Sequence, residues 1–159
     1  MKIYIIPILQ DNYAYLLEAD GKAAVVDPGE AYPVIRAVED LKLQLTHIIN
    51  THHHGDHIAG NAELKAKYGA QVVGPDDNRI PDLDVKLKEG DDFTFGAFKA
   101  KILETPGHTR THICFYFPDI RALFTGDTIF SMGCGRLFEG TPDQMWNSFE
   151  IGRASCRER

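Results

Sequence analysis

The chain has 159 residues, of which 43% are hydrophobic and 10% aromatic, and its formal net charge is −6. This length predicts one domain, and its apolar content can form a core without disulfide cross-links. The acidic balance argues against a protein that binds nucleic acid by neutralising phosphates. The three cysteines form no CxxC pair, which is typical of a reducing cytosol. No segment has the features of a signal peptide or the length of a membrane span, so we expect a cytoplasmic protein that does not contact the membrane.

Short β-type runs separated by turn residues fill the first part of the chain. The runs that predict strands here lie at 3–7, 14–18, 22–27 and 45–50. Asp20-Gly21 predicts a hairpin between the second and third of them. Pro33 opens a predicted helix that continues to about Lys42, and a second helix is expected from 58 to 68, stopped by Gly69.

The second part of the chain is also dominated by strands. They are expected at 71–74, 92–95, 98–104, 113–117 and 122–126. Strands outnumber helices, so the fold class is α/β, with sheets covered by outer helices. Trp146 and Phe149 begin an amphipathic helix that we expect to stop early. Residues 151–159 carry three arginines and differ in character from the acidic body, so we expect a cloning artefact there rather than a basic interaction tail, and a domain that spans 1–150.

The most informative segment is Thr51-His52-His53-His54-Gly55-Asp56-His57. It places four imidazoles and a carboxylate, which zinc and iron prefer as ligands, within seven residues. The segment lies between a predicted buried strand and a predicted helix. Open α/β sheets place their sites on such loops, at the carboxyl ends of strands. We therefore predict a metal site here.

Two later segments repeat this arrangement. His108 follows the strand that ends near Glu104, and Asp127 lies at the tip of an apolar strand. A carboxylate in such a place is costly unless it is paired or binds a metal. Asp27 has a similar position, and it is either a residue that orients a ligand histidine or simply the first residue of a turn.

These motifs resemble the metallo-β-lactamase superfamily, whose signature is H-x-H-x-D-H, then T-P-G-H-T, then G-D-T. All three occur here in that order, at 52–57, 105–109 and 126–128. Within the superfamily the chain is similar to the hydroxyacylglutathione hydrolases, also called glyoxalase II. The narrower resemblance rests on Asp11-Asn12-Tyr13 and above all on Gly133-Cys134-Gly135-Arg136-Leu137-Phe138-Glu139-Gly140-Thr141.

The resemblance implies an αββα sandwich, incomplete at its C-terminal end, and two divalent metal positions for zinc, iron or manganese. The first position would be held by His52, His54 and His108, the second by Asp56 and His57, and Asp127 would bridge the two. A metal-bound hydroxide would then cleave S-2-hydroxyacylglutathione to glutathione and a 2-hydroxy acid. Asp56 would also be catalytic, because it would orient the attacking water.

The resemblance further implies that Arg136 binds the glutathione carboxylate, with Leu137 and Phe138 beside it. The family has a seventh metal ligand, a histidine, and a C-terminal helical domain that binds glutathione. This chain has no histidine after His112, and we expect it to lack that domain. We therefore expect a monomer with one tight metal site and weak or no activity.

Two other readings stay open. The persulfide dioxygenases of the same superfamily use one iron bound by two histidines and an aspartate, a role that His52, His108 and Asp127 could fill. The presence of Asp56 and His57 favours the hydrolase. The third reading is a metal-binding fragment without turnover.

Overall fold

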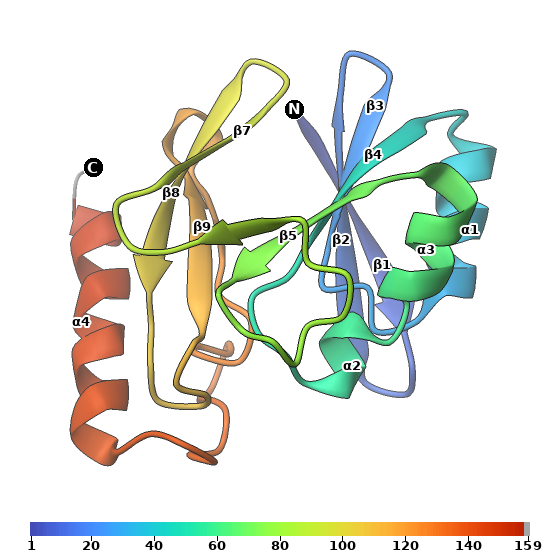
Figure 1. The fold of residues 1–159 in the computed structure, drawn as a ribbon. Helices are drawn as coiled ribbons and strands as arrows, with labels where there is room; N and C mark the ends of the chain where they lie inside the picture. Colours follow the sequence, from blue (N-terminus) through green and yellow to red (C-terminus); the bar gives the residue numbers. More distant parts are fainter. Residues whose placement is uncertain (158–159) are drawn as a thin grey trace.

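The computed structural model describes the backbone of residues 1–157 and the side chains of residues 1–150. Two β-sheets pack face to face, and helices lie on both outer sides (Figure 1). The expected αββα sandwich is thus confirmed. No helix among the described residues combines the length and apolar character needed to cross a membrane.

The larger sheet contains six strands in the order in which they occur in the chain: β1 Lys2–Ile8, β2 Asn12–Ala19, β3 Lys22–Val26, β4 Gln44–Ile49, β5 Gln71–Pro75 and β6 Val85–Leu87. Strands β1 to β3 are antiparallel, and β3 to β6 are parallel. The predicted hairpin is confirmed, because Asp20 and Gly21 both have positive φ, at 51° and 75°. Strand β6 was not predicted, because its three residues are too few to show a period in the sequence.

The smaller sheet is antiparallel and has the order β10-β9-β8-β7. Its strands are β7 Asp92–Phe95, β8 Phe98–Glu104, β9 Ile113–Phe117 and β10 Ala122–Phe124. The first three have the predicted bounds. Strand β10 ends two residues before the predicted bound, and Thr125 and Gly126 already belong to the loop that carries Asp127.

The helices are α1 Ala31–Asp40, α2 Gly55–Ile58, α3 Asn61–Tyr68, the 3-10 turn η1 Pro118–Ile120, and α4 Pro142–Arg157. The prediction of one helix over 58–68 is wrong, because the chain breaks at Ala59 and Gly60 into two helices. The expected end at Gly69 is confirmed by its left-handed φ of 66°. The prediction that the last helix stops early is also wrong, since α4 continues to Arg157.

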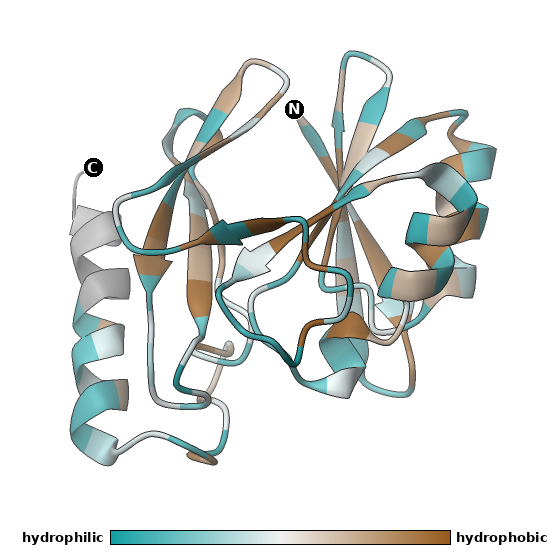
Figure 2. Cartoon of the chain, in the orientation of Figure 1, coloured by the Kyte–Doolittle hydropathy of each residue, from teal (hydrophilic) through white to brown (hydrophobic). Residues whose placement is uncertain are grey.

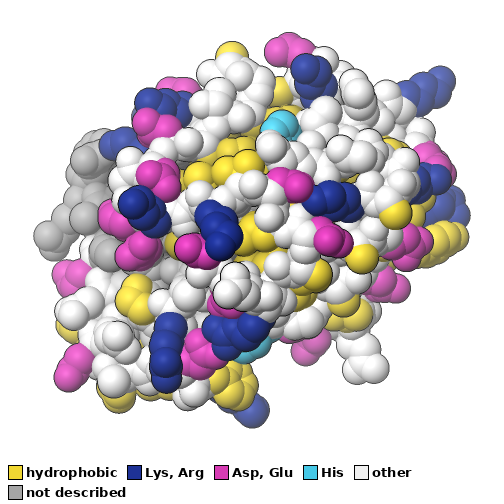
Figure 3. Space-filling view, viewed as in Figure 1, with side chains coloured by type: hydrophobic (Ala, Val, Ile, Leu, Met, Phe, Trp, Pro, Cys, Tyr) yellow, Lys and Arg dark blue, Asp and Glu magenta, His cyan; other side chains and the backbone are white. Residues whose placement is uncertain are grey.

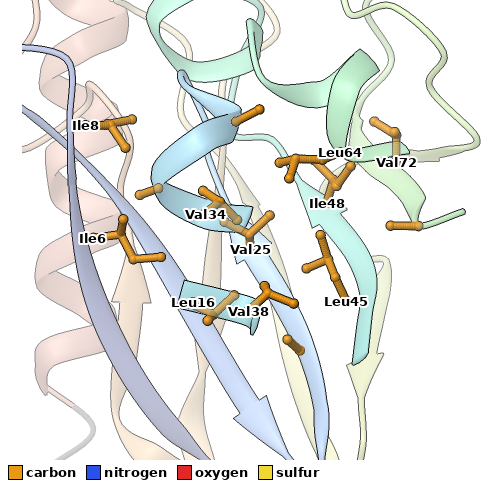
Figure 4. Packing of buried hydrophobic residues seen from close by; sticks show 14 of the residues in the cluster. Ile6, Ile8, Leu16, Val25, Val34, Val38, Leu45, Ile48, Leu64 and Val72 are labelled. Carbon is orange, nitrogen blue, oxygen red and sulfur yellow. The ribbon is translucent and has the colours of Figure 1, made fainter. Parts of the chain in front are cut away.

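Two apolar clusters hold the layers together. The first lies between the six-stranded sheet and helices α1 and α3, and it includes Val34, Ile48 and Leu64 (Figure 4). The second fills the space between the two sheets, where Ile49 meets aromatic side chains such as Phe115. The hydrophobic stretches of Figure 2 follow these buried strands. Helix α4 lies along the outer side of the smaller sheet (Figure 1).

The loops at one end of the sandwich carry the predicted site residues. Asp27 follows β3, and Thr51 and its histidine neighbours follow β4, which runs parallel to β3. Loops after β8 and β10 bring His108 and Asp127 to the same region, within reach of the histidine loop. The two sheets therefore build this end of the molecule together, as expected for sites at the carboxyl ends of strands.

Candidate metal centre

The histidine loop is held by amides from its own flanks. Asn50 and Asn61 are both buried, and Asn61 Nδ2 donates to Asn50 Oδ1 at 2.7 Å. Asn50 Nδ2 also donates to the carbonyl of His57 at 3.3 Å. These bonds tie the end of β4 to the start of α3, so the intervening residues are held in a defined shape.

Three imidazoles converge from two loops. His54 Nδ1 lies 3.1 Å from His52 Nε2 and 2.8 Å from His108 Nε2. Zinc–nitrogen bonds of about 2.0–2.1 Å in tetrahedral geometry would place such nitrogens about 3.3 Å apart. Asp127 Oδ2 lies 3.2 Å from His108 Nε2, beside this group of three imidazoles. The donor type and the spacing of the three imidazoles thus fit a divalent ion.

The tautomer of His108 is set by a backbone group. Its Nδ1 lies 2.7 Å from the carbonyl oxygen of Arg136, which can only accept. Nδ1 therefore carries the hydrogen, and Nε2 presents its lone pair to His54 and Asp127. Outer hydrogen bonds of this kind orient metal-binding histidines in general.

A second group shares His52 and adds His57 and Asp127, with ligand atoms within 4.8 Å of one another. Asp127 Oδ1 lies 3.2 Å from His57 Nε2, while its other oxygen faces His108. Asp127 thus lies between the two groups. Asp56 Oδ2 lies 3.4 Å from His57 Nε2, at the exposed rim of this second group, and it accepts the side-chain amide of Asn12 at 3.3 Å.

Asp27 is buried behind the second group. Its carboxylate accepts the N–H of Thr51 at 2.8 Å and the hydroxyl of the same residue at 2.7 Å. Oδ2 also lies 3.1 Å from Nδ1 of His57. Of the two readings of Asp27, the structure favours the residue that orients a histidine over the simple turn.

The electrostatics differ between His52 and His57. Burial strongly lowers the pKa of His52, and the neighbouring imidazoles lower it further, so its ring is neutral. For His57, burial lowers the pKa, but the surrounding carboxylates outweigh it and raise the pKa to about 12. The imidazole of His57 holds the pKa of Asp56 at about 2. Without a cation this site carries a proton on His57, and a divalent ion would replace that proton.

The segment 133–141 lies over the first group. The N–H of Phe138 donates to the His108 carbonyl at 3.2 Å, and the Phe138 ring lies edge-on to those of His54 and His108, with centroids 5.4 Å apart in each case. Phe138 and Leu137 are exposed, as is Arg136, whose backbone carbonyl is held by His108. Three predicted substrate contacts therefore line an open face beside the imidazoles.

A charged cluster holds the far end of that segment. Arg79 pairs with both Asp77 and Glu139, and Glu139 accepts the backbone N–H of Arg110 at 2.9 Å. His53 lies between the two carboxylates, 3.4 Å from Asp77 and 3.8 Å from Glu139, and belongs to neither metal group. This cluster could not be predicted from the sequence, because its members are far apart in the chain.

A cavity of about 800 Å³ opens on the other side of the centre. His57, Asp27 and Asp127 lie at its polar end, and Tyr15 and Phe124 are among its apolar walls. Elsewhere, positive and negative side chains are interspersed on the face seen in Figure 3.

Comparison with known proteins agrees with this geometry. A model of the metallo-beta-lactamase superfamily matches residues 9–152. The chain belongs to this superfamily. The chain is similar to a solved structure of ETHE1 from Myxococcus xanthus, with a TM-score of 0.83 and 31% identity over 94% of this chain and 68% of that one. It is also similar to TTHA1623 in a di-iron-bound form, with a TM-score of 0.79 and 26% identity over 97% of this chain and 86% of that one.

Curated proteins give a narrower likeness. A protein of Methylococcus capsulatus named hydroxyacylglutathione hydrolase is 52% identical over 158 residues, which is 97% of this chain and 62% of that protein. A protein of the same name from Pelagibacter ubique is 53% identical over 152 residues. The resemblance stated from the motifs is thus confirmed. The chain spans about 60% of the length of the curated relatives it matches.

Proposed function

We propose that this chain is the metal-binding part of a thioester hydrolase that cleaves S-2-hydroxyacylglutathione to glutathione and a 2-hydroxy acid. The observation that carries the proposal is the convergence of His52, His54 and His108 beneath the segment 133–141. Similarity to proteins named hydroxyacylglutathione hydrolase supports the same reaction. We also propose a small glutathione thioester as the ligand, a monomeric state and a cytoplasmic location.

The proposed metal ligands divide into two sets. His52, His54, His108 and Asp127 would hold one divalent ion, and Asp56 and His57 would hold a second that shares Asp127. Zinc, iron and manganese all accept imidazole and carboxylate ligands, and the di-iron relative supports iron as well as zinc. The first set offers four protein ligands and the second three, so we propose that the 159-residue polypeptide binds one ion tightly and the other weakly.

A divalent ion bound there would supply Lewis-acid polarisation of the thioester carbonyl and a water of lowered pKa. The chain would supply orientation. Asp56 is half-exposed and ionised at neutral pH, so its free oxygen can accept a hydrogen bond from the attacking water. Asp27 and the Arg136 carbonyl keep Nε2 of His57 and His108 directed inward.

Phe138 and Arg136 would bind the substrate. The exposed Phe138 ring beside two imidazoles offers an apolar wall for the acyl chain. The Arg136 side chain is exposed and its backbone is held by His108, so its guanidinium can pair with a glutathione carboxylate. Thiolate is a good leaving group, so no acid is needed on that side.

The test uses the purified 159-residue polypeptide, with metal content and hydrolysis of S-D-lactoylglutathione measured in the same sample. His54→Asn should lose most of the tight ion, whereas His53→Asn should keep it, because His53 faces Asp77 and Glu139. Arg136→Ala should raise KM and leave metal content unchanged. If His53→Asn and His54→Asn lose metal equally, the ligand assignment is wrong. Oxygen consumption with glutathione persulfide would instead support the dioxygenase reading.

A further inference from the structure

His112 is fully buried behind the candidate metal centre and belongs to neither ligand group. Its ring stacks on that of His52, with centroids 4.9 Å apart and 26° between the planes. Its Nε2 accepts the backbone N–H of Asp127 at 3.2 Å. An imidazole nitrogen that accepts a hydrogen bond carries no hydrogen, so the neutral ring must carry its hydrogen on Nδ1.

The surroundings of Nδ1 match that assignment. Thr105 Oγ1 lies 2.8 Å from Nδ1 of His112 and can accept its hydrogen, and it also accepts the hydroxyl of Thr128 at 3.1 Å. The hydroxyl hydrogen of Thr105 is then free for Cys114 Sγ at 3.3 Å, and that thiol faces the carbonyl of Thr125 at 3.8 Å. Every donor in this series has an acceptor. In the opposite tautomer the N–H at Nε2 of His112 would face the backbone N–H of Asp127, and neither group could accept.

Gly126 makes this contact possible. It has a φ of +45°, and a Cβ there would lie 2.7 Å from Nε2 of His112 and 2.3 Å from Oγ1 of Thr51. Any larger residue would push the imidazole away from the amide of Asp127. Gly126 and Asp127 thus pack as one unit with His112, which lies 14 positions before Gly126 in the chain.

We propose that His112 is a positioning residue for the metal centre, because it fixes the backbone that carries the Asp127 carboxylate. The two oxygens of that carboxylate each lie 3.2 Å from a different imidazole, on His57 and on His108. A small shift of the backbone would therefore disturb both groups at once. The inference rests on the metal-binding part of the proposed function and is independent of the thioester reaction.

The first test needs no substitution. Long-range proton–nitrogen correlation spectra of the metal-free, ¹⁵N-histidine-labelled chain at neutral pH report which ring nitrogen bears hydrogen. His112 should show the Nδ1–H tautomer. The Nε2–H tautomer or an imidazolium would overturn the proposal. This measurement reports the contact between His112 and Asp127 even if the chain binds no metal, so it separates that contact from the proposed thioester reaction.

The second test compares two substitutions of similar size. In His112→Gln the side-chain oxygen can reach the former position of Nε2 and accept the Asp127 N–H, whereas in His112→Asn the amide reaches only as far as Nδ1. Competition of zinc with a chromogenic chelator should show a loss in affinity of about tenfold or more for the asparagine variant, with most of it regained in the glutamine variant. His47→Asn is the control, since His47 contacts Phe93 and Phe95 on β7, outside both groups. Equal affinities for the two His112 variants, or an equal loss in the control, would overturn the proposal.

Discussion

Substitution of Asp27 by asparagine tests how far a buried carboxylate behind the metal centre supports the fold. The two side chains have nearly the same shape, so the change removes a charge and one acceptor without opening a cavity. In the parent chain Asp27 accepts two hydrogen bonds from Thr51 and lies 3.1 Å from Nδ1 of His57. All three donors belong to the histidine loop.

The size of the destabilisation depends on which carboxylate oxygen of Asp27 the asparagine replaces. The asparagine carbonyl can still accept the Thr51 N–H, but an NH₂ group replaces Oδ2, which faces the Thr51 hydroxyl and His57 Nδ1. Hydrogen bonds to charged groups contribute about 1.5–3 kcal/mol each. The new NH₂ group can donate to Oγ1 of Thr51, which recovers part of the loss. We expect the free energy of unfolding to fall by about 3 kcal/mol, a large share of the roughly 5–15 kcal/mol of a typical domain.

Urea denaturation of the metal-free chain at pH 7, followed by circular dichroism, measures that loss. The thermal midpoint should fall by about 6–12 °C. Asp92→Asn is the matched control, because its ion pair with Lys99 is largely exposed and should contribute less than about 1 kcal/mol. If Asp27→Asn costs no more than this control, the carboxylate does not hold the histidine loop and the reasoning is refuted.

Three further outcomes are expected. Arg79→Met should destabilise the chain by on the order of 1 kcal/mol at pH 7. The guanidinium holds the pKa of Glu139 at about 2, against an ordinary 4.5, so the part of this difference that comes from Glu139 should be complete above about pH 4.5 and be lost as the pH falls through about 2 in stepped urea titrations. The part that comes from Asp77, whose pKa the same guanidinium also lowers, should persist to lower pH. Gly126→Ala should lower both the thermal midpoint and the zinc affinity. Gly21→Ala is the control, because Gly21 also has a positive φ but nothing lies within 4 Å of the added Cβ. This control measures the cost of the backbone conformation alone and should leave the zinc affinity unchanged. Phe115→Ala, fully buried between the sheets, should lower the free energy of unfolding by about 3–5 kcal/mol in urea titrations, and a cost below about 1 kcal/mol would contradict the packing.

The strands were predictable because their signals are local. Alternating or continuous apolar runs with turn residues between them gave β7, β8 and β9 their observed bounds. The break between α2 and α3 was not anticipated, although Gly60 stood inside the expected helix. A Cβ on Gly60 would lie 2.5 Å from the carbonyl of Pro28, so packing between loops, rather than helix propensity, decides the break.

The candidate site was predictable only in part, because only some of its residues are close together in the sequence. The spacing of His52, His54, Asp56 and His57 is visible in the sequence, whereas their outer partners come from distant segments. Nothing in the sequence places Nε2 of His112 against the amide of Asp127. Contacts of this kind depend on how the two sheets meet, which no local pattern encodes.

Thr51 is the point at which the two sheets meet at the site. Its N–H and hydroxyl bind Asp27 at the end of β3, and its carbonyl accepts the N–H of Ile113 on β9 at 3.0 Å. His52 follows Thr51 in the chain and His112 precedes Ile113, and the rings of these two histidines stack on each other. A change in the packing between the sheets must therefore move both histidines. Metal affinity should then depend on the interior between the sheets as well as on the ligands, so core variants should weaken metal binding before they unfold the chain.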